Sequence, residues 1–146
     1  MTDVRFIQMT SSTSNLMQYL GLVCKGMHSL DVETLPDLSR KLNDGSNRAW
    51  WAVISTNIVG WCLLAPNNNR IAEHAGHLGG GWVNPNYRNR GIGQQLWQYR
   101  IAQVPHNRPV SVSIQPDNKA STALATKLGF KHIDYVYPWN NLLLNR

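Results

Sequence analysis

The stretch that most constrains the fold of this chain spans residues 81–96. Its pattern predicts a strand that ends near Val83, a short turn, and then a basic glycine loop that leads directly into a helix. The central motif of this loop is Arg88-x-x-Gly91-x-Gly93. Because the glycines carry no side chain, several backbone N–H groups can point at one ligand, and the helix start adds the positive end of its dipole. The fold must therefore contain a strand that feeds a helix through a tight loop.

Two interpretations of this loop stay open on glycine spacing alone. In the first, the loop binds an anion such as a phosphate or pyrophosphate, since Arg88 and Arg90 add full charges that match phosphate geometry. In the second, it is a plain strand-to-helix turn with two surface arginines.

The composition narrows the class of protein. With 146 residues, 42% of them hydrophobic, the sequence predicts one globular domain over residues 1–146. The net charge of +6 favours an anionic partner, but no run of Lys and Arg forms a nucleic-acid arm, so we expect no nucleic acid as partner. No apolar run approaches the roughly 20 residues of a membrane span, and no signal peptide is visible. Cys24 and Cys62 lack CxxC spacing and are expected to be reduced thiols of a cytoplasmic protein without a membrane partner.

Hydrophobic periodicity and turn residues predict an α/β fold. The expected strands cover residues 4–9, 50–55, 58–64, 71–83, 110–114, 130–137 and 142–144, and the expected helices cover residues 13–25, 32–42, 91–103 and 118–128. Turns are expected at Thr56-Asn57 and at residues 66–69, and the glycines at 79–81 suggest a bulge. The hairpin region favours antiparallel pairing, while the helix over 91–103 favours a parallel crossover. The predicted class is a mixed, mostly antiparallel central sheet flanked by helices.

Two motifs and this order of elements resemble the GNAT N-acetyltransferase family. Residues 83–96 are similar to the acetyl-CoA motif of that family, in which a strand leads to Arg/Gln-x-x-Gly-x-Gly/Ala at a helix start. Residues 118–130 resemble the later family helix that ends in a Gly-Phe pair. The two motifs occur in family order, and the resemblance covers residues 77–132.

The resemblance implies acetyl-CoA as co-substrate, bound mainly by backbone groups. Backbone N–H groups around residues 88–94 would hold its pyrophosphate, and the strand near Trp82 would pair with its pantetheine arm. In the family this strand splays from the next one, here residues 110–114, and the arm enters the gap. The implied cofactor-binding residues are Trp82, Val83, Arg88, Asn89, Arg90, Gly91, Ile92, Gly93, Gln94 and Asn118.

The resemblance also implies candidates for the general base. Several family members use a glutamate on the strand before the glycine loop, and His77 occupies that place here. Glu73 lies four residues earlier and would share the strand face if the strand were regular. We expect His77, or else Glu73, to take the proton of the acceptor amine, while the alternative for His77 is a polar strand residue near a cleft. Glu73, His74 and His77 lack a fourth ligand, so no metal is expected.

One departure from the family pattern concerns the general acid. Many members carry a tyrosine five residues before the phenylalanine of the Gly-Phe pair, and Ala125 stands there in this sequence. A solvent proton could serve a thiolate whose thiol has a pKa of about 8.5, and Tyr135 or Tyr137 could replace the missing phenol. A non-catalytic acyl-CoA-binding regulatory module is the alternative that this departure raises.

The acceptor is expected to be an amine. The resemblance places its pocket between the first two helices and strand ends that carry tryptophans, namely Trp50, Trp51, Trp61 and Trp82. Aromatic walls suit an apolar or cationic amine, whereas the alternative is that these side chains are core packing. The expected activity is direct transfer of an acetyl group from acetyl-CoA to a primary amine of a small molecule or peptide, by a chain that could form a homodimer.

Overall fold

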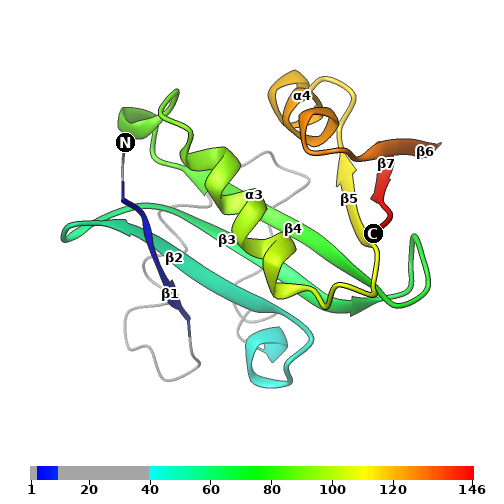
Figure 1. The fold of residues 1–146 in the computed structure, drawn as a ribbon, viewed down its shortest axis with the longest axis horizontal. Coiled ribbons are helices and arrows are strands. Elements are labelled where there is room, and N and C mark those ends of the chain that lie inside the picture. The colour runs from blue at the N-terminus through cyan, green and yellow to red at the C-terminus, as the bar shows by residue number, and fades with distance from the viewer. Residues whose placement is uncertain (1–2, 10–39) are drawn as a thin grey trace. The chain divides into compact units, whose positions relative to one another are not determined.

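The computed structural model describes residues 3–9 and 40–146 (Figure 1). The helix expected over residues 13–25, and most of the one expected over 32–42, lie outside these described residues, although residues 40–43 are helical. None of the helices within the described ranges has the length and apolar character that a membrane span requires.

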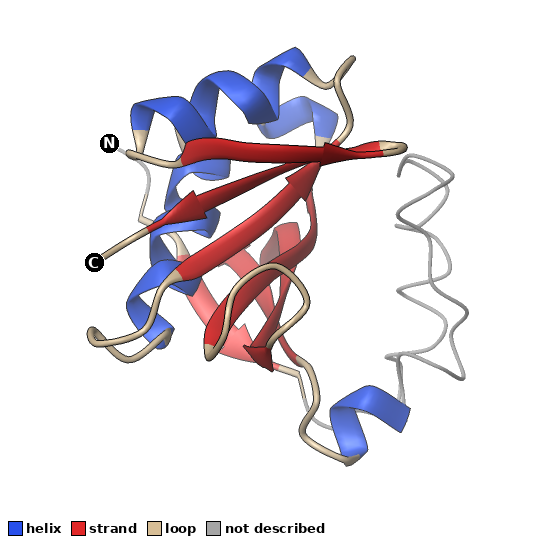
Figure 2. Cartoon of the chain, turned by 90° about the vertical axis from the view of Figure 1, so that its right-hand side faces the viewer, coloured by secondary structure: helices blue, strands red, loops and turns tan. Residues whose placement is uncertain are grey.

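The strands of the described residues form a 7-stranded sheet in the order β1-β2-β3-β4-β5-β7-β6; they are labelled in Figure 1 and drawn in red in Figure 2. Their bounds are β1 Arg5–Gln8, β2 Arg48–Ile54, β3 Asn57–Asn68, β4 Ala75–Val83, β5 Val110–Ile114, β6 Lys131–Val136 and β7 Trp139–Leu144. Besides the helical residues 40–43, the helices of the described residues are the 3₁₀ turn η1 Pro85–Tyr87, α3 Ile92–Gln103 and α4 Lys119–Lys127. Strands β4 and β5 are parallel, and β1–β2, β2–β3, β5–β7 and β6–β7 are antiparallel. The predicted mixed α/β class is confirmed.

The chain divides into two compact units. One comprises Met1–Leu64 with Gly80–Leu96, and the other comprises Ala65–Gly79 with Trp97–Arg146. The expectation of a single domain over residues 1–146 stays a prediction.

The first unit is built on the β2–β3 hairpin. Its turn lies at Ser55-Thr56, one residue earlier than predicted, and Ser55 has a positive φ of 54°. Alternating residues of the two strands form one apolar cluster together with Met9. The strand residues are Ala49, Trp51, Val53, Trp61 and Leu63, and Trp82 packs against the cluster. Trp50 is also buried, and the Arg48 guanidinium lies 4.9 Å from the centre of its ring. Trp50, Trp51 and Trp61 are therefore core side chains in this unit.

The end of β3 corrects the turn that was predicted at residues 66–69. The strand continues to Asn68, although Pro66 has no backbone N–H for a ladder. The first residue of β2, Arg48, pairs with Leu64, so the part of β3 after Leu64 extends beyond β2. Because β2 has no residue opposite Pro66, the absence of an N–H there costs no hydrogen bond to β2.

The turn between β3 and β4 therefore begins later in the sequence than predicted, and so does β4. The carboxamide oxygens of Asn68 and Asn69 accept the N–H groups of Arg70 and His74 at 2.9 and 2.8 Å. His74 takes a left-handed φ of 59°. These contacts hold residues 69–74 in a turn, so β4 begins at Ala75 and not at residue 71.

The second unit contains β5, β6, β7, α4 and the larger part of α3. Trp97 of α3 packs edge-to-face on Phe130, with ring centroids 5.7 Å apart and an interplanar angle of 87°. The final strand predicted at residues 142–144 is confirmed and is longer, and β7 lies between β5 and β6. Every residue of the edge strand β6 is exposed.

Candidate functional site

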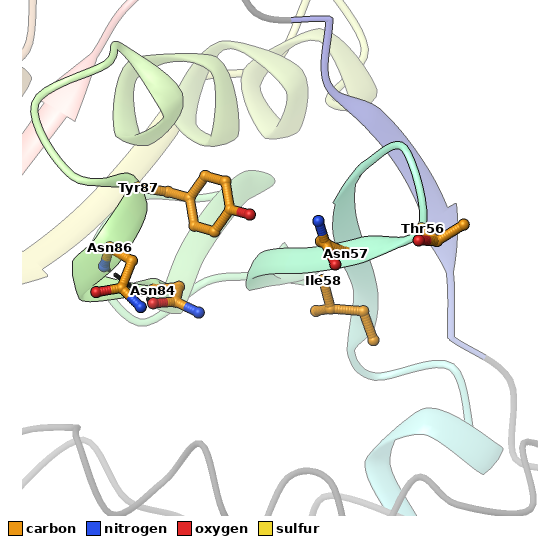
Figure 3. A pocket seen from close by; sticks show the side chains of 6 residues that line it. All are labelled: Thr56, Asn57, Ile58, Asn84, Asn86 and Tyr87. Atoms are coloured by element: carbon orange, nitrogen blue, oxygen red, sulfur yellow. Dashed lines mark hydrogen bonds between the residues drawn. The ribbon is translucent and has the colours of Figure 1, made fainter.

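The predicted strand end, glycine loop and helix start are confirmed, and all three lie in the first unit. Strand β4 ends at Val83, η1 follows, and α3 begins at Ile92. Asn84 organises the start of this connection, because its carboxamide oxygen accepts the Asn86 N–H at 3.0 Å (Figure 3). In addition, the Asn84 N–H donates to the Val59 carbonyl at 2.8 Å. Asn84 therefore fixes the direction in which the chain leaves the sheet after β4.

Two residues of the loop have left-handed backbones. Asn89 has a φ of 63° and Gly91 a φ of 80°, a region that asparagine tolerates and glycine adopts freely. A Cβ built at Gly91 or at Gly93 would meet nothing within 4 Å. The glycines therefore leave space open in front of the backbone, and at Gly91 the conformation also favours glycine.

The start of α3 is electropositive. Its hydrogen bonding begins with the Gln95 N–H, which donates to the Gly91 carbonyl at 3.2 Å, so Ile92 and Gly93 precede the first helical bond. The first turn carries no acidic residue that would offset the helix dipole. Together with the open space at the glycines, this arrangement suits an anionic ligand.

The two arginines of the loop are exposed and each also has a structural contact. The Arg88 Nε donates to the Val83 carbonyl at 3.1 Å, which ties the loop to the end of β4. The Arg90 guanidinium lies 5.2 Å from the centre of the Tyr87 ring. A guanidinium has five N–H donors, so these contacts are compatible with additional bonds to a ligand.

A hollow of about 490 Å³ lies next to this connection in the first unit (Figure 3). It is lined by the hairpin residues Thr56, Asn57 and Ile58 and by Asn84, Asn86 and Tyr87. The lining offers carboxamides and hydroxyls without a carboxylate or an ammonium group. Sequence reasoning missed this hollow, because its two sides are far apart in the chain and each looks like ordinary turn composition.

In the second unit, the partly buried His77 and the buried Ser111 form a polar pair on neighbouring strands. They are partners in the β4–β5 register, and the His77 Nδ1 lies 2.8 Å from the Ser111 Oγ. Burial, with the nearby positive charges of Arg70 and Arg100, lowers the pKa of His77 to about 4. The imidazole of His77 is therefore neutral near pH 7.

The β4–β5 pairing is short. It comprises Gly76–Val110, His77–Ser111 and Leu78–Val112, although β4 continues to Val83 and β5 to Ile114. Just past the last pair, the Gly79 carbonyl accepts a hydrogen bond of 2.9 Å from Arg100 Nη1, and Arg100 is only 2% exposed.

Sequence reasoning missed Arg100, although a signal was present. Arg100 follows Ile92 and Leu96 at intervals of four residues, which places it on the buried face of α3. The preceding residue of α3, Tyr99, is only half-buried, whereas Arg100 is buried.

Glu73 does not lie on a strand. It belongs to the turn before β4, where its carboxylate is 83% exposed and lies 3.6 Å from the His74 Nε2. The expectation that Glu73 shares a strand face with His77 is therefore wrong, because the Asn68 and Asn69 caps keep this segment in a turn. Within residues 3–9 and 40–146, His, Cys, Asp and Glu side chains form no group of three that could hold a metal ion.

The second family-like motif forms α4 as expected. Asn118 is its N-cap, and the carboxamide oxygen accepts the Ser121 N–H at 3.2 Å. Ala125 is completely buried and its carbonyl accepts the Phe130 N–H at 3.0 Å. Tyr135 and Tyr137 are 52% and 85% exposed, so neither phenol is enclosed within its unit.

Solved structures with this fold are numerous and distant in sequence. An acetyltransferase from Thermus thermophilus has a TM-score of 0.72 at 18% identity, with 99% of each chain covered. The Campylobacter jejuni N-acetyltransferase PseH in complex with acetyl coenzyme A has a TM-score of 0.73 at 16% identity, again over 99% of each chain. The NatC complex bound to Gag peptide and CoA contains a chain with a TM-score of 0.79 at 16% identity and 99% coverage of both.

Sequence comparison supplies the family. No curated protein matches the chain. A family model described as "Acetyltransferase (GNAT) family" matches residues 18–130, which is most of the sequence. The chain therefore belongs to the GNAT acetyltransferase family.

Proposed function

We propose that this chain is an acetyl-CoA-dependent N-acetyltransferase that passes the acetyl group directly to a primary amine of a small molecule or a peptide. The observation that carries the proposal is the loop before α3, with left-handed Asn89 and Gly91 and open space at both glycines. Solved relatives of the same fold were obtained with acetyl coenzyme A or with CoA and a peptide, which supports this donor and this kind of acceptor.

The cofactor would be held mainly by backbone. N–H groups of residues 88–94 would bind the pyrophosphate, with Arg88 and Arg90 as additional charges and with Asn118 as a further contact. Backbone at Trp82 and Val83 would pair with the pantetheine arm, much as an added strand pairs with a sheet edge.

The reaction needs no covalent enzyme intermediate. The neutral amine nitrogen attacks the thioester carbonyl carbon, and backbone N–H groups of β4 stabilise the negative charge that develops on the carbonyl oxygen. The C–S bond then breaks, the amine proton passes to a base, and CoA leaves as a thiolate. Because Ala125 has no proton to give, solvent protonates the thiolate.

His77 can act as the base in only one of its two neutral tautomers. If the Nδ1–H donates to the Ser111 Oγ, the Nε2 lone pair can accept a proton; if the Ser111 hydroxyl donates to Nδ1, then Nε2 already carries the hydrogen. The lowered pKa of about 4 makes His77 a weak base that is available over the whole neutral range. Glu73, exposed in its turn, is the second choice.

The proposal is tested by turnover. The purified chain is mixed with acetyl-CoA and a panel of primary amines and blocked peptides with free N-termini, and free CoA thiol is measured. Amine-dependent thiol release, with the acetylated product identified by mass spectrometry, is the expected result. Failure to bind acetyl-CoA at all would reject the proposal.

A non-catalytic acyl-CoA-binding module is the second candidate, and Ala125 favours it. It predicts saturable acetyl-CoA binding with no thiol release above the background hydrolysis rate on any amine of the panel. The same experiment therefore separates the two functions.

A further inference from the structure

We propose that Arg100 is a positioning residue for acetyl-CoA, because it fixes the peptide group between Gly79 and Gly80 where β4 leaves its pairing with β5. The inference rests on the proposed function, which assigns the backbone of β4 to the cofactor.

The contact lies just past the end of the β4–β5 ladder. Leu78–Val112 is the last pair of the β4–β5 ladder, and Gly79 is the next residue of β4. A strand that loses its parallel partner also loses the hydrogen bonds that hold its peptide groups in the plane of the sheet. At this point the Gly79 carbonyl accepts the 2.9 Å bond from Arg100 of α3.

The sequence of β4 gives such a contact a clear role. Gly79, Gly80 and Gly81 are consecutive, and a glycine peptide has more accessible backbone conformations than any other. Without a fixed partner, the peptide group between Gly79 and Gly80 could rotate at little cost. A charged donor gives a stronger bond than a neutral one and can hold the group in one orientation.

Arg100 is itself held in place. Its side chain is 2% exposed, and its guanidinium lies 5.8 Å from the centre of the Trp97 ring. Trp97 is in turn packed edge-to-face on Phe130. A donor that is locked by packing presents its N–H group with little loss of side-chain entropy when the bond forms.

The consequence concerns the Gly80 N–H. The peptide bond is planar and trans, so the carbonyl of Gly79 and the N–H of Gly80 point in opposite directions. Because Arg100 of α3 binds the carbonyl, the Gly80 N–H points away from the Arg100 side chain. We assign this N–H the role of a donor to the acetyl-CoA arm, oriented in advance by an arginine that does not touch the cofactor.

The test compares Arg100→Met with Arg146→Met. Methionine at 100 keeps most of the apolar stem and removes the donors. Arg146 is a matched control from the same unit, because its Nη2 also donates to backbone carbonyls, those of Val104 and Pro105 at 2.9 and 3.0 Å, far along the chain from Gly79. The dissociation constant of acetyl-CoA is measured by calorimetry, and the Gly80 amide is followed by ¹⁵N NMR with and without cofactor.

The expected result is about tenfold weaker acetyl-CoA binding for Arg100→Met, with a displaced and broadened Gly80 resonance already in the free protein. Arg146→Met should bind acetyl-CoA as the wild type does, whatever happens to its Tm. Wild-type affinity in Arg100→Met would overturn the inference and leave the proposed function intact. A wild-type protein that does not bind acetyl-CoA would overturn both.

A third variant keeps the inference testable if Arg100→Met does not fold. Arg100→Lys retains the charge and a donor but loses the planar guanidinium. We expect binding a few times weaker than wild type and a smaller displacement of the Gly80 resonance than methionine would cause. An unchanged Gly80 resonance together with wild-type affinity would contradict the role of Arg100.

Discussion

The loop before α3 and the end of the β4–β5 ladder differ in where their polar groups find partners: the loop exposes them, whereas the ladder bonds them inside the protein. In the loop, Arg88 and Arg90 are exposed, and the space in front of Gly91 is open. At the end of the ladder, His77 is bonded to Ser111 and the buried Arg100 is bonded to a backbone carbonyl.

This difference separates two kinds of function. A loop with exposed charge and open backbone can exchange water for a ligand, so its residues act by direct contact. Polar groups that are bonded inside the protein act by holding geometry, since exposing or unpairing them is costly. Changes in the loop should therefore weaken binding with little loss of stability. Changes at the ladder should also affect stability and its pH dependence, and should weaken binding only by disturbing geometry.

The largest effect is expected for Gly91→Val. A β-branched residue is strained at a φ of 80°, and the adaptation that relieves the strain would redirect the backbone N–H groups of the loop. We expect acetyl-CoA affinity to fall more than about a hundredfold, or more than about 2.7 kcal/mol, as measured by calorimetry.

Gly45→Val is the control for this change. Gly45 has a φ of 78° and also has nothing within 4 Å of a built Cβ, so valine brings similar strain there without touching the loop. Its acetyl-CoA affinity should equal that of the wild type, and the Tm values of the two variants should be similar. Equal loss of affinity in both variants would mean that strain, and not loop geometry, weakens binding.

The second effect concerns the pH dependence of stability at His77. Its pKa is lowered from 6.5 to about 4 in the folded chain, so the unfolded chain binds more protons between these values. Stability that depends on a neutral His77 is present above about pH 6.5 and is lost as the pH falls toward 4. The loss should be about 2 kcal/mol, allowing for partial exposure.

Urea unfolding of wild type and His77→Gln at pH 7 and pH 4.5 measures this effect. The glutamine variant should lose less stability over this range, because it has no imidazole to protonate. An identical loss of stability in the two proteins would show that protonation of His77 does not cause the pH dependence.

The sequence predicted those parts of the fold that depend on local patterns. The glycine loop, the α3 start and the β2–β3 hairpin follow from glycines, turn residues and alternation within a few positions. Glu73 was misplaced because the side chains of Asn68 and Asn69 bond to backbone further along the turn, and a periodic reading of residues 71–83 does not include such caps.

The part that sequence reasoning missed depends on distant partners. Arg100 was not among the predicted site residues, because its hydrogen-bond partner Gly79 lies 21 residues away in the sequence. The lowered pKa of His77 likewise requires its burial and two arginines that are separate from it in sequence. Neither environment could be derived from the residues adjacent in the chain.

The smallest effect is expected for Gly93→Ala. This position is helical with no positive φ, and a built Cβ meets nothing within 4 Å. Alanine should raise the free energy of unfolding by about 0.5 kcal/mol through helix propensity, and acetyl-CoA affinity should change less than about threefold. A loss larger than that of Gly91→Val would place the closest approach of the cofactor at Gly93.

The binding of acetyl-CoA at the loop before α3 can be tested directly. A ¹⁵N NMR titration of the wild-type chain with acetyl-CoA locates the contact through the backbone amides themselves. We predict saturable shifts that are largest at Arg90, Gly91, Ile92, Gly93 and Gln94 and that disappear in Gly91→Val. Saturable binding that leaves these amides unchanged, or no binding at all, would contradict the assignment of this loop to the cofactor.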